Sequence, residues 1–264
     1  ADAAITMCGS RLVKAGEILG EIAVASLIYD AASMVVVSHV KGHINAGYAG
    51  AIKNLAMGGV SSSHRGCGWK CGRGAMHAVG EGRLMWDPEK CELCYQCEET
   101  CPLECISFKS GGKQFTYEDE RCWRCGRCTR VCPEGAIIME GANEGTFLKA
   151  LAEAAKAVLS TFKPGKVIYI NFLTEIQPEC DCMPGADVPV IQDQGIMVSD
   201  DLVAVEQASL DLCRKAQPLP QSAASDKNIT GDVLFGLHAK DGSLQMEEAE
   251  RLGLGSRKYE LVEI

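Results

Sequence analysis

The chain lacks three features that mark common protein classes. No uninterrupted apolar run reaches the length of a bilayer span, and the most hydrophobic stretch, 18–37, is broken by Glu21 and Asp30. No charged segment followed by a cleavable apolar stretch stands near the first residue, so no secretion signal is visible. The glycine-rich stretch 66–74 lacks the spacing of a P-loop or a dinucleotide-binding fingerprint. We therefore expect no membrane span, no secreted protein and no nucleotide cofactor.

Positive charge is in the minority too. The 264 residues include 26 Lys and Arg against 35 Asp and Glu, which gives a net charge of -9 and a pI near 5.1. Electrostatic binding to nucleic acid or to an anionic membrane is therefore not expected. With 47% hydrophobic residues, the chain can bury the core of one large domain or two modest ones. Its first residue, Ala1, is not a methionine, which suggests a fragment or a processed product.

Cysteine, in contrast, is abundant. Eight of the 15 cysteines fall in two copies of one spacing, Cys-x2-Cys-x2-Cys-x3-Cys-Pro. This is the spacing of bacterial ferredoxins, in which three cysteines of one copy and the fourth cysteine of the other copy hold one cluster. We therefore assign one 4Fe-4S cluster to Cys91, Cys94, Cys97 and Cys132. The second 4Fe-4S cluster is assigned to Cys122, Cys125, Cys128 and Cys101.

Two other uses of these eight cysteines fit the pattern less well. Structural zinc needs only four thiolates in a tetrahedron and has no use for a third cysteine two residues after a pair, or for the cysteine-proline ending. Disulfides among eight closely spaced thiols would scramble among many connectivities. Fifteen cysteines without a secretion signal instead indicate metal chemistry in a reducing, anaerobic cytoplasm.

The hydrophobic pattern outside the cysteine motifs indicates an α/β protein. Apolar residues at three- and four-residue intervals predict helices, and continuous β-branched runs predict strands that are buried on both faces. The predicted helices cover 11–31, 147–159, 202–212 and 247–252. The predicted strands cover 34–37, 166–173, 188–190 and 196–198. We expect a mostly parallel sheet flanked by helices.

This α/β pattern stops at the cysteine motifs and resumes after them, which indicates an insertion. The larger domain is expected to comprise 1–84 and 141–264. The insert, an α+β two-cluster ferredoxin-like module, is expected to comprise 85–140. Inside it, a Gly-Gly pair between polar and aromatic residues predicts a β-hairpin over 107–117.

A second candidate site follows the strand predicted over 34–37. Ligands of open α/β sheets lie beyond the carboxyl ends of strands, and this position carries His39, Lys41 and His43. Histidine can act as an acid-base group or a metal ligand, and lysine can hold a substrate carboxylate. The residues that could form this ligand pocket are His39, Lys41, His43, Lys53, Asn54 and Asp193. The alternative is that they are polar loop residues that hold backbone turns together.

Seven cysteines remain outside the two motifs. Cys105 and Cys213 occupy positions typical of buried packing thiols. A Cys-Asp-Cys string in a proline-containing loop directs both of its sulfurs the same way and could chelate a soft metal. A third metal or cluster site could be formed by Cys67, Cys71, Cys180 and Cys182. The alternative is that these four are simple loop thiols.

Several strings of the sequence occur in one recognisable order. They are Ser38-His39-Val-Lys41-Gly42-His43, Gly50-Ala-Ile-Lys53-Asn54-Leu, Met57-Gly58, the cysteine insert, Tyr169-Ile-Asn171-Phe172, Pro178-Glu-Cys180-Asp181-Cys182, Asp193-Gln-Gly195-Ile196 and Leu252-Gly-Leu-Gly255-Ser-Arg-Lys-Tyr259-Glu-Leu. In these strings the chain resembles the iron-sulfur-centre proteins of the family called domain of unknown function 362. Members usually carry a sizeable α/β segment before the first string, so the resemblance implies an N-terminally truncated α/β domain. Cys67 and Cys71 stand where the family tends to have an Arg-x-Gly-Lys run.

Three functions are compatible with these residues. The first, which we favour, is an electron-transfer protein or subunit that relays single electrons through two clusters between redox protein partners. The second is an iron-sulfur oxidoreductase whose clusters feed a substrate or metal site formed by the pocket residues with Cys180 and Cys182. The third is a structural role, with the clusters as folding staples.

The charges around the two motifs differ in sign. The acidic residues of the first motif are Glu89, Glu92, Glu98 and Glu99, and the basic residues of the second are Arg121, Arg124, Arg127 and Arg130. Acidic neighbours lower a cluster's potential and basic ones raise it, so electrons are expected to run from the first cluster to the second. The arginines could instead mark a docking face for an acidic partner. A surface that passes electrons to a partner often also supports a dimer, so a homodimer is left open.

Overall fold

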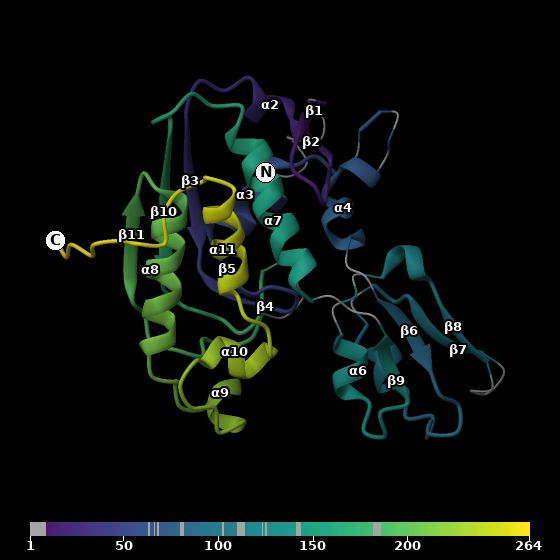
Figure 1. Ribbon diagram of the computed structural model, residues 1–264. Coiled ribbons are helices and arrows are strands. Elements are labelled where there is room, and N and C mark those ends of the chain that lie inside the picture. The colour runs from purple at the N-terminus through teal and green to yellow at the C-terminus, as the bar shows by residue number, and fades with distance from the viewer. Residues whose placement is uncertain are drawn as a thin grey trace. The chain divides into compact units, whose positions relative to one another are not determined.

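The computed structural model describes residues 9–62, 64–65, 67, 69–79, 82–101, 103–109, 114–122, 124, 126–140, 144–181 and 186–264. The chain divides into two compact units, shown in Figure 1. The larger unit comprises Ala1–Val79 and Gly145–Ile264, and the cysteine-rich unit comprises Gly80–Glu144. The predicted insert, 85–140, lies within the cysteine-rich unit. None of the helices in the described part of the chain combines the length and apolar character needed to cross a bilayer.

The central sheet of the larger unit has three strands in the order β11 (Gly195–Ser199), β10 (Val167–Leu173) and β3 (Met34–His39). β10 is parallel to β3, with Val167 opposite Met34, and antiparallel to β11. The expectation of a mostly parallel sheet is therefore corrected to a small mixed sheet. Parallel neighbours require a long crossover, usually helical, whereas no helix is described between β10 and β11, and the chain returns antiparallel.

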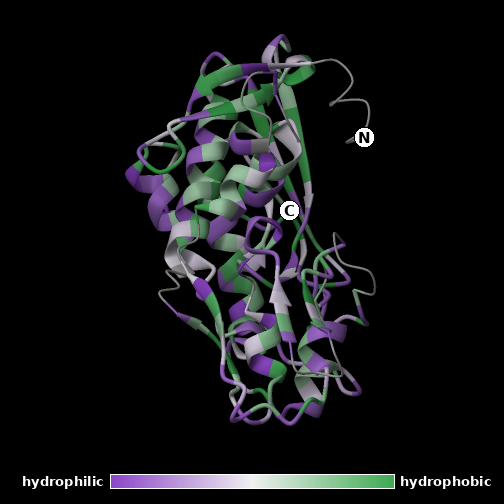
Figure 2. Ribbon diagram, turned by 90° about the vertical axis from the view of Figure 1, so that its right-hand side faces the viewer, coloured by the Kyte–Doolittle hydropathy of each residue, from purple (hydrophilic) through white to green (hydrophobic). Residues whose placement is uncertain are grey.

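Only one face of this sheet is buried. Along β3, Val36 and Ser38 are buried, whereas Val35 and Val37 are exposed. The expectation of burial on both faces is thus met on one face only, although both long strands are rich in hydrophobic residues (Figure 2). Helices α3 (Ala51–Gly59) and α8 (Leu202–Lys215) pack on the buried face of the sheet. The residues that follow β3 and β10 lie at the ends of these strands, because the two strands are parallel.

The predicted helices after the insert are confirmed. α7 (Glu144–Leu159) carries the apolar stripe and packs against α3, where Val158 lies against Gly59. α8 begins at an aspartate cap, because the side chain of Asp201 accepts hydrogen bonds from the backbone of Val203 and Ala204. The remaining helices are α9 (Ala223–Asp226), α10 (Val233–His238) and α11 (Ser243–Arg251). The strand predicted over 188–190 is wrong, since this segment is irregular.

The helix predicted over 11–31 is also wrong. The segment forms an antiparallel hairpin of β1 (Ser10–Lys14) and β2 (Glu21–Ala25), followed by the short α2 (Ser26–Tyr29). Gly20 supplies the left-handed backbone conformation of the turn, with a φ of 63°. Glu153 of α7 accepts hydrogen bonds from the backbone of the loop, and four residues of β2 are fully buried. Tertiary burial thus overrides the helical spacing.

Besides α3, a β-hairpin and two short helices lie between β3 and the cysteine-rich unit in the sequence. β4 (Lys41–His43) and β5 (Gly47–Ala49) form a buried antiparallel hairpin directly after β3. The short helix η1 (Trp69–Cys71) and α4 (Arg73–Ala78) precede the cysteine-rich unit. β4 therefore carries Lys41 and His43 into the interior of the larger unit.

The cysteine-rich unit contains two antiparallel pairs of strands. β6 (Arg83–Trp86) pairs with β9 (Ile137–Glu140), and β7 (Ile106–Lys109) pairs with β8 (Gln114–Tyr117). The second pair confirms the hairpin predicted over 107–117. Its short helices are α5 (Gln96–Glu99), η2 (Asp119–Arg121) and α6 (Arg127–Val131). The core of the unit is small and includes two of the motif cysteines; its buried members are Leu84, Cys97, Ile106, Cys128 and Ile137.

Candidate functional site

The four cysteines assigned to the first cluster line one cavity. Cys91, Cys94 and Cys97 come from the first motif and Cys132 from the end of the second. The cavity has a volume of about 350 Å³, including the part that opens to solvent, and its other walls include Phe108. The chain thus brings together thiols from both motifs, in the crossed combination that a two-cluster ferredoxin uses.

The two motifs share an unusual backbone conformation. Leu93 and Tyr95 have φ values of 57° and 58°, in the left-handed region. Arg124 and Gly126, at the equivalent positions of the second motif, have φ values of 52° and 71°. Backbone turns that contain left-handed residues can direct successive N–H groups toward one point and create a concavity for anions, a feature of many iron-sulfur sites. Three of these four residues are not glycine, so the two motifs repeat an uncommon backbone conformation at matching positions.

Backbone N–H groups also reach two of the motif sulfurs. The N–H of Ala136 donates to Sγ of Cys132 at 3.2 Å, and that of Arg124 donates to Sγ of Cys122 at 3.3 Å. Such donors stabilise a thiolate. At Cys97, burial outweighs the backbone hydrogen bonds to its sulfur and raises the pKa of the thiol to about 11. A metal that binds Cys97 must therefore displace its proton.

The second set of cysteines lies beside Cys105, which was not predicted as a site residue. Cys125 lies outside the described residues, and Cys101, Cys122 and Cys128 are partly or fully buried. The buried thiol of Cys105 lies 3.4 Å from Sγ of Cys101. A hydrogen bond from Cys105 is the main cause that lowers the pKa of Cys122 to about 6. Cys105, expected to be a packing thiol, is therefore also in contact with predicted cluster ligands.

The thiols assigned to the first cluster surround a cavity. In the described part of the chain, no group of three or more His, Cys, Asp or Glu side chains is close enough to hold one metal ion. A cubane needs wider spacing, because each of its four irons takes one thiolate from a different direction. Four thiols around a cavity, rather than around a point, match that requirement.

The basic residues at the end of β3 and on β4 form a connected group in the larger unit. Nε2 of His39 donates to the carbonyl oxygen of Thr174 at 2.8 Å, which leaves Nδ1 to accept from Nζ of Lys41 at 3.3 Å. Nζ of Lys41 also lies 2.6 Å from Oδ2 of Asp181. Partial burial raises the pKa of Asp181, but the hydrogen bond and charge of Lys41 outweigh it and hold the pKa below its usual value.

Lys53 and Asn54, on α3, reach the same region from the other side. Nζ of Lys53 donates to Sγ of Cys180 at 3.3 Å. The amide of Asn54 donates to the carbonyl oxygen of Val37 and to the hydroxyl of Ser38, both at 2.9 Å. The structure therefore brings predicted pocket residues from β3, α3 and the loop after β10 together.

Two neutral histidines lie beneath this group. Nδ1 of His43 accepts from the backbone N–H groups of Asn45 and Ala46, and burial, aided by the charge of Lys53, lowers the pKa of His43 well below its usual value. Burial likewise lowers the pKa of His77 to about 4. Both imidazoles stack against Phe147. His77, on α4, was not predicted, since it lies outside every motif.

Glu206 is a second buried residue without a motif. Its carboxylate accepts from the backbone N–H groups of Ala51 and Ile52 at the start of α3, from the hydroxyl of Tyr48 and from the amide of Asn171. Burial raises the pKa of Glu206 despite these donors. Glu206 thereby caps α3, the helix that carries Lys53 and Asn54. An acid on the buried face of the predicted helix over 202–212 was the signal that could have revealed it.

The remaining predicted residues are not brought into one site. Asp193 accepts from the backbone N–H of Glu175 at 2.7 Å and shapes the loop after β10. Cys67 and Cys71 form a disulfide with each other, and while that bond exists neither sulfur can bind a metal. Cys182 lies outside the described residues. A third metal site formed by these cysteines with Cys180 stays a prediction.

These features define a class: an α/β protein whose cysteine-rich insert carries a duplicated, cavity-forming thiol motif. The family model "Domain of unknown function (DUF362)" matches residues 4–211, well over half of the chain. The chain belongs to this family, as the sequence strings indicated. The match covers the whole cysteine-rich unit and ends within α8. No curated protein shows significant similarity to the chain.

Proposed function

We propose that this protein transfers single electrons through two 4Fe-4S clusters held in the cysteine-rich unit, between protein redox partners. The observation that carries the proposal is the shared cavity of Cys91, Cys94, Cys97 and Cys132. Three of these thiols belong to one motif and the fourth to the other, as in two-cluster ferredoxins. The repeated left-handed backbone of the two motifs supports a second, equivalent site at Cys101, Cys122, Cys125 and Cys128.

The chain's own residues would hold the clusters and adjust their potentials. When bound, the clusters supply one-electron redox chemistry. The four thiolates at each site hold the iron, and the N–H donors of Ala136 and Arg124 reduce the charge on two sulfurs, which raises the potential. Phe108 and Ile137 line the first cavity and keep water from part of it.

The positive charge around the second motif is smaller than its number of arginines suggests. Arg121 pairs with Glu118 at 2.9 Å, and Arg124 pairs with Asp119 at 3.2 Å. Each carboxylate offsets the positive charge beside it, and the exposed members are screened by salt. We expect electrons to run from the first cluster to the second, because the first motif carries acidic side chains and the second basic ones.

The test is a count of transferable electrons. Anaerobically purified protein is reduced with dithionite, freed of reductant and titrated with a one-electron acceptor. We expect about two electrons per chain from the clusters and, in the reduced form, two interacting S = 1/2 signals in low-temperature EPR. A chain that binds iron but returns no electrons would leave the clusters a structural role and reject the proposal.

A second candidate function is favoured by the convergence of Lys41, Lys53 and Cys180 in the larger unit. There the clusters would serve an oxidoreductase, with Lys53 holding a substrate carboxylate. The test is the melting temperature in the presence of small carboxylates, for the wild type and for Lys53→Met. A carboxylate that stabilises the wild type but not the variant supports this function. Equal responses of the two proteins would remove it.

A further inference from the structure

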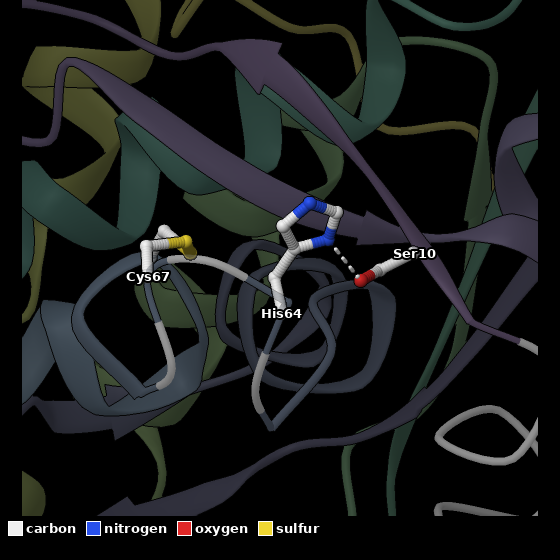
Figure 3. Close-up of a disulfide and its surroundings, with 4 residues drawn as sticks. Ser10, His64 and Cys67 are labelled. Carbon is white, nitrogen blue, oxygen red and sulfur yellow. Dashed lines mark hydrogen bonds between the residues drawn. A yellow bond between two sulfur atoms is a disulfide. The ribbon is translucent and has the colours of Figure 1, made fainter.

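A disulfide in the larger unit has no part in the functions proposed above. Cys67 and Cys71 are joined across η1, with Cα atoms 5.9 Å apart (Figure 3). We propose that this disulfide is redox-active: it accepts two electrons, and the resulting dithiol reduces a disulfide of a partner molecule. The inference rests on the proposed function in one respect, since the reduced iron-sulfur clusters are the electron source.

The disulfide is poorly placed to act as a structural staple. It spans a sequence separation of only four residues, and the entropy that a disulfide removes from the unfolded chain grows with loop length. None of the other cysteines in the described part of the chain forms a disulfide, so the protein is not of the kind that disulfides hold together. The short loop thus gives this bond less of a structural role than a bond that closes a long loop would have, and favours a redox role.

The surrounding backbone holds the segment without help from the bond. The N–H of Arg73 donates to the carbonyl oxygen of Ser61 at 2.9 Å, and the N–H of Ser61 donates to that of Ala23 on β2 at 2.8 Å. On the other side, the hydroxyl of Ser10 and Nδ1 of His64 share a hydrogen bond of 2.8 Å, which Figure 3 shows beside the disulfide. Both ends of the segment are thus anchored to the β1–β2 hairpin. The bond can open and close while these contacts persist.

The two sulfurs differ in access, as an attacking and a resolving thiol do. Cys67 is half-buried, whereas Cys71 is buried, with 6% of its surface exposed. A partner can therefore reach Cys67 first. Cys71 stays within bonding distance and can release the partner afterwards.

The charges along this segment favour thiolate chemistry. No aspartate or glutamate occurs from 54 to 79, although acids outnumber bases in the chain as a whole. The basic residues nearest the two cysteines in sequence are Arg65, Lys70 and Arg73. Positive neighbours stabilise thiolates, and the thiolate is the form that attacks a disulfide.

The S–S bond of Cys67 and Cys71 breaks as it takes up two electrons, one from each reduced cluster, and two protons from water. The Cys67 thiolate then attacks a partner disulfide, which forms a mixed disulfide and releases one partner thiol. The Cys71 thiolate attacks Cys67 of that mixed disulfide, restores the original bond and releases the second partner thiol.

The first experiment measures the redox state of Cys67 and Cys71 and does not use the clusters as the electron source. The full chain is equilibrated anaerobically in buffers of reduced and oxidised dithiothreitol, alkylated with iodoacetamide and digested for mass spectrometry. We expect Cys67 and Cys71 to gain label together in one reversible two-electron transition, with Cys213, a buried thiol of α8, as the unlabelled control. Label at both cysteines that persists in oxidised dithiothreitol, or a change that does not reverse, would overturn the proposal.

The second experiment uses glutathione disulfide as the probe. The Cys71→Ser variant should trap a mixed disulfide between glutathione and Cys67, because the resolving thiol is gone. The Cys67→Ser variant should trap at least tenfold less, because Cys71 is buried. Equal trapping by both variants would contradict the assigned roles, and no trapping by either would overturn the proposal.

A third experiment separates the failure of this inference from the failure of the proposed function. Iron-loaded protein is reduced, and label at Cys67 is compared between the wild type and Cys97→Ser, which lacks a ligand of the first cluster. We expect the label to fall at least several-fold in the variant. If the wild type carries its full iron and the wild type and variant are labelled equally at Cys67, the electron path to the disulfide is rejected. The electron-transfer proposal would then still stand. Absence of iron would reject the electron-transfer proposal together with the electron source named here, and the first two experiments would then decide whether Cys67 and Cys71 exchange with a partner disulfide.

Discussion

Nζ of Lys41 lies 2.6 Å from Oδ2 of Asp181, although 140 residues separate the two in sequence. The lysine side chain is 10% exposed and the aspartate 59%, so a nearly buried ammonium is paired with a carboxylate at the surface. This contact joins β4 to the loop after β10. It closes the group that also contains His39.

A double-mutant cycle with Lys41→Met and Asp181→Asn should show that the contact stabilises the fold. We expect a coupling free energy of about 1 kcal/mol in urea denaturation, because one partner is buried and the other is solvated. The pKa of Asp181 is lowered in the fold, so the stabilisation is present above the usual aspartate pKa and is lost as the pH falls through the folded value. The exposed pair of Arg11 and Asp30, 3.5 Å apart, is the matched control and should show almost no coupling. A coupling as small as that of the control would contradict the structural role.

This pair shows how far the sequence could predict the basic group. His39 and Lys41 were identified because they follow a strand within a few residues. Asp181 was not, because its role depends on how a loop from the far end of the chain packs against β4. No local pattern encodes such a contact.

Replacement of Glu206 should destabilise the larger unit. In Glu206→Gln, one amide hydrogen would face the N–H of Ala51 or Ile52 in place of an acceptor oxygen. A buried donor left unsatisfied costs about 1 to 3 kcal/mol, so we expect the free energy of unfolding to fall by about 2 kcal/mol. Urea denaturation measures this change. Glu247→Gln on the exposed side of α11 is the control and should change stability by no more than about 0.5 kcal/mol. An equal effect of the two substitutions would argue against capping by Glu206.

The stability of the larger unit should fall in mild acid because of His77. Its folded pKa of about 4 lies below the ordinary histidine value of 6.5, so the fold holds the neutral form. As the pH falls below 6.5, His77 binds a proton in the unfolded chain, whereas in the folded chain it stays neutral until the pH approaches 4. The free energy of unfolding should therefore drop by about 3 kcal/mol from this residue between pH 7 and pH 4.

His77→Gln isolates this contribution, since glutamine does not titrate. The pKa of His43 is lowered too, so the variant should retain some acid sensitivity. The difference between wild type and variant is the quantity to follow, by urea denaturation from pH 7 to pH 4. Parallel curves for the two proteins would show that His77 is not buried in its neutral form.

The fold shows where local pattern is sufficient and where it is not. The strand over 166–173 was predicted from a continuous apolar run, and the helix over 147–159 from an apolar stripe at helical spacing. The hairpin of β1 and β2 was missed because the same apolar residues also fit a helical spacing. Glu153, which holds the turn of that hairpin, is more than a hundred residues away. The cysteine motifs were readable because ligand spacing is local.

The most direct test of the account is the iron content of matched cysteine variants. Cys97 and Cys213 are both buried, but only Cys97 lines the cavity of the first predicted cluster. Iron and acid-labile sulfide are measured per chain in anaerobically purified wild type, Cys97→Ser and Cys213→Ser. The account predicts about eight irons in the wild type and in Cys213→Ser, and about four in Cys97→Ser. Wild-type iron in Cys97→Ser, or zinc without iron in the wild type, would contradict it.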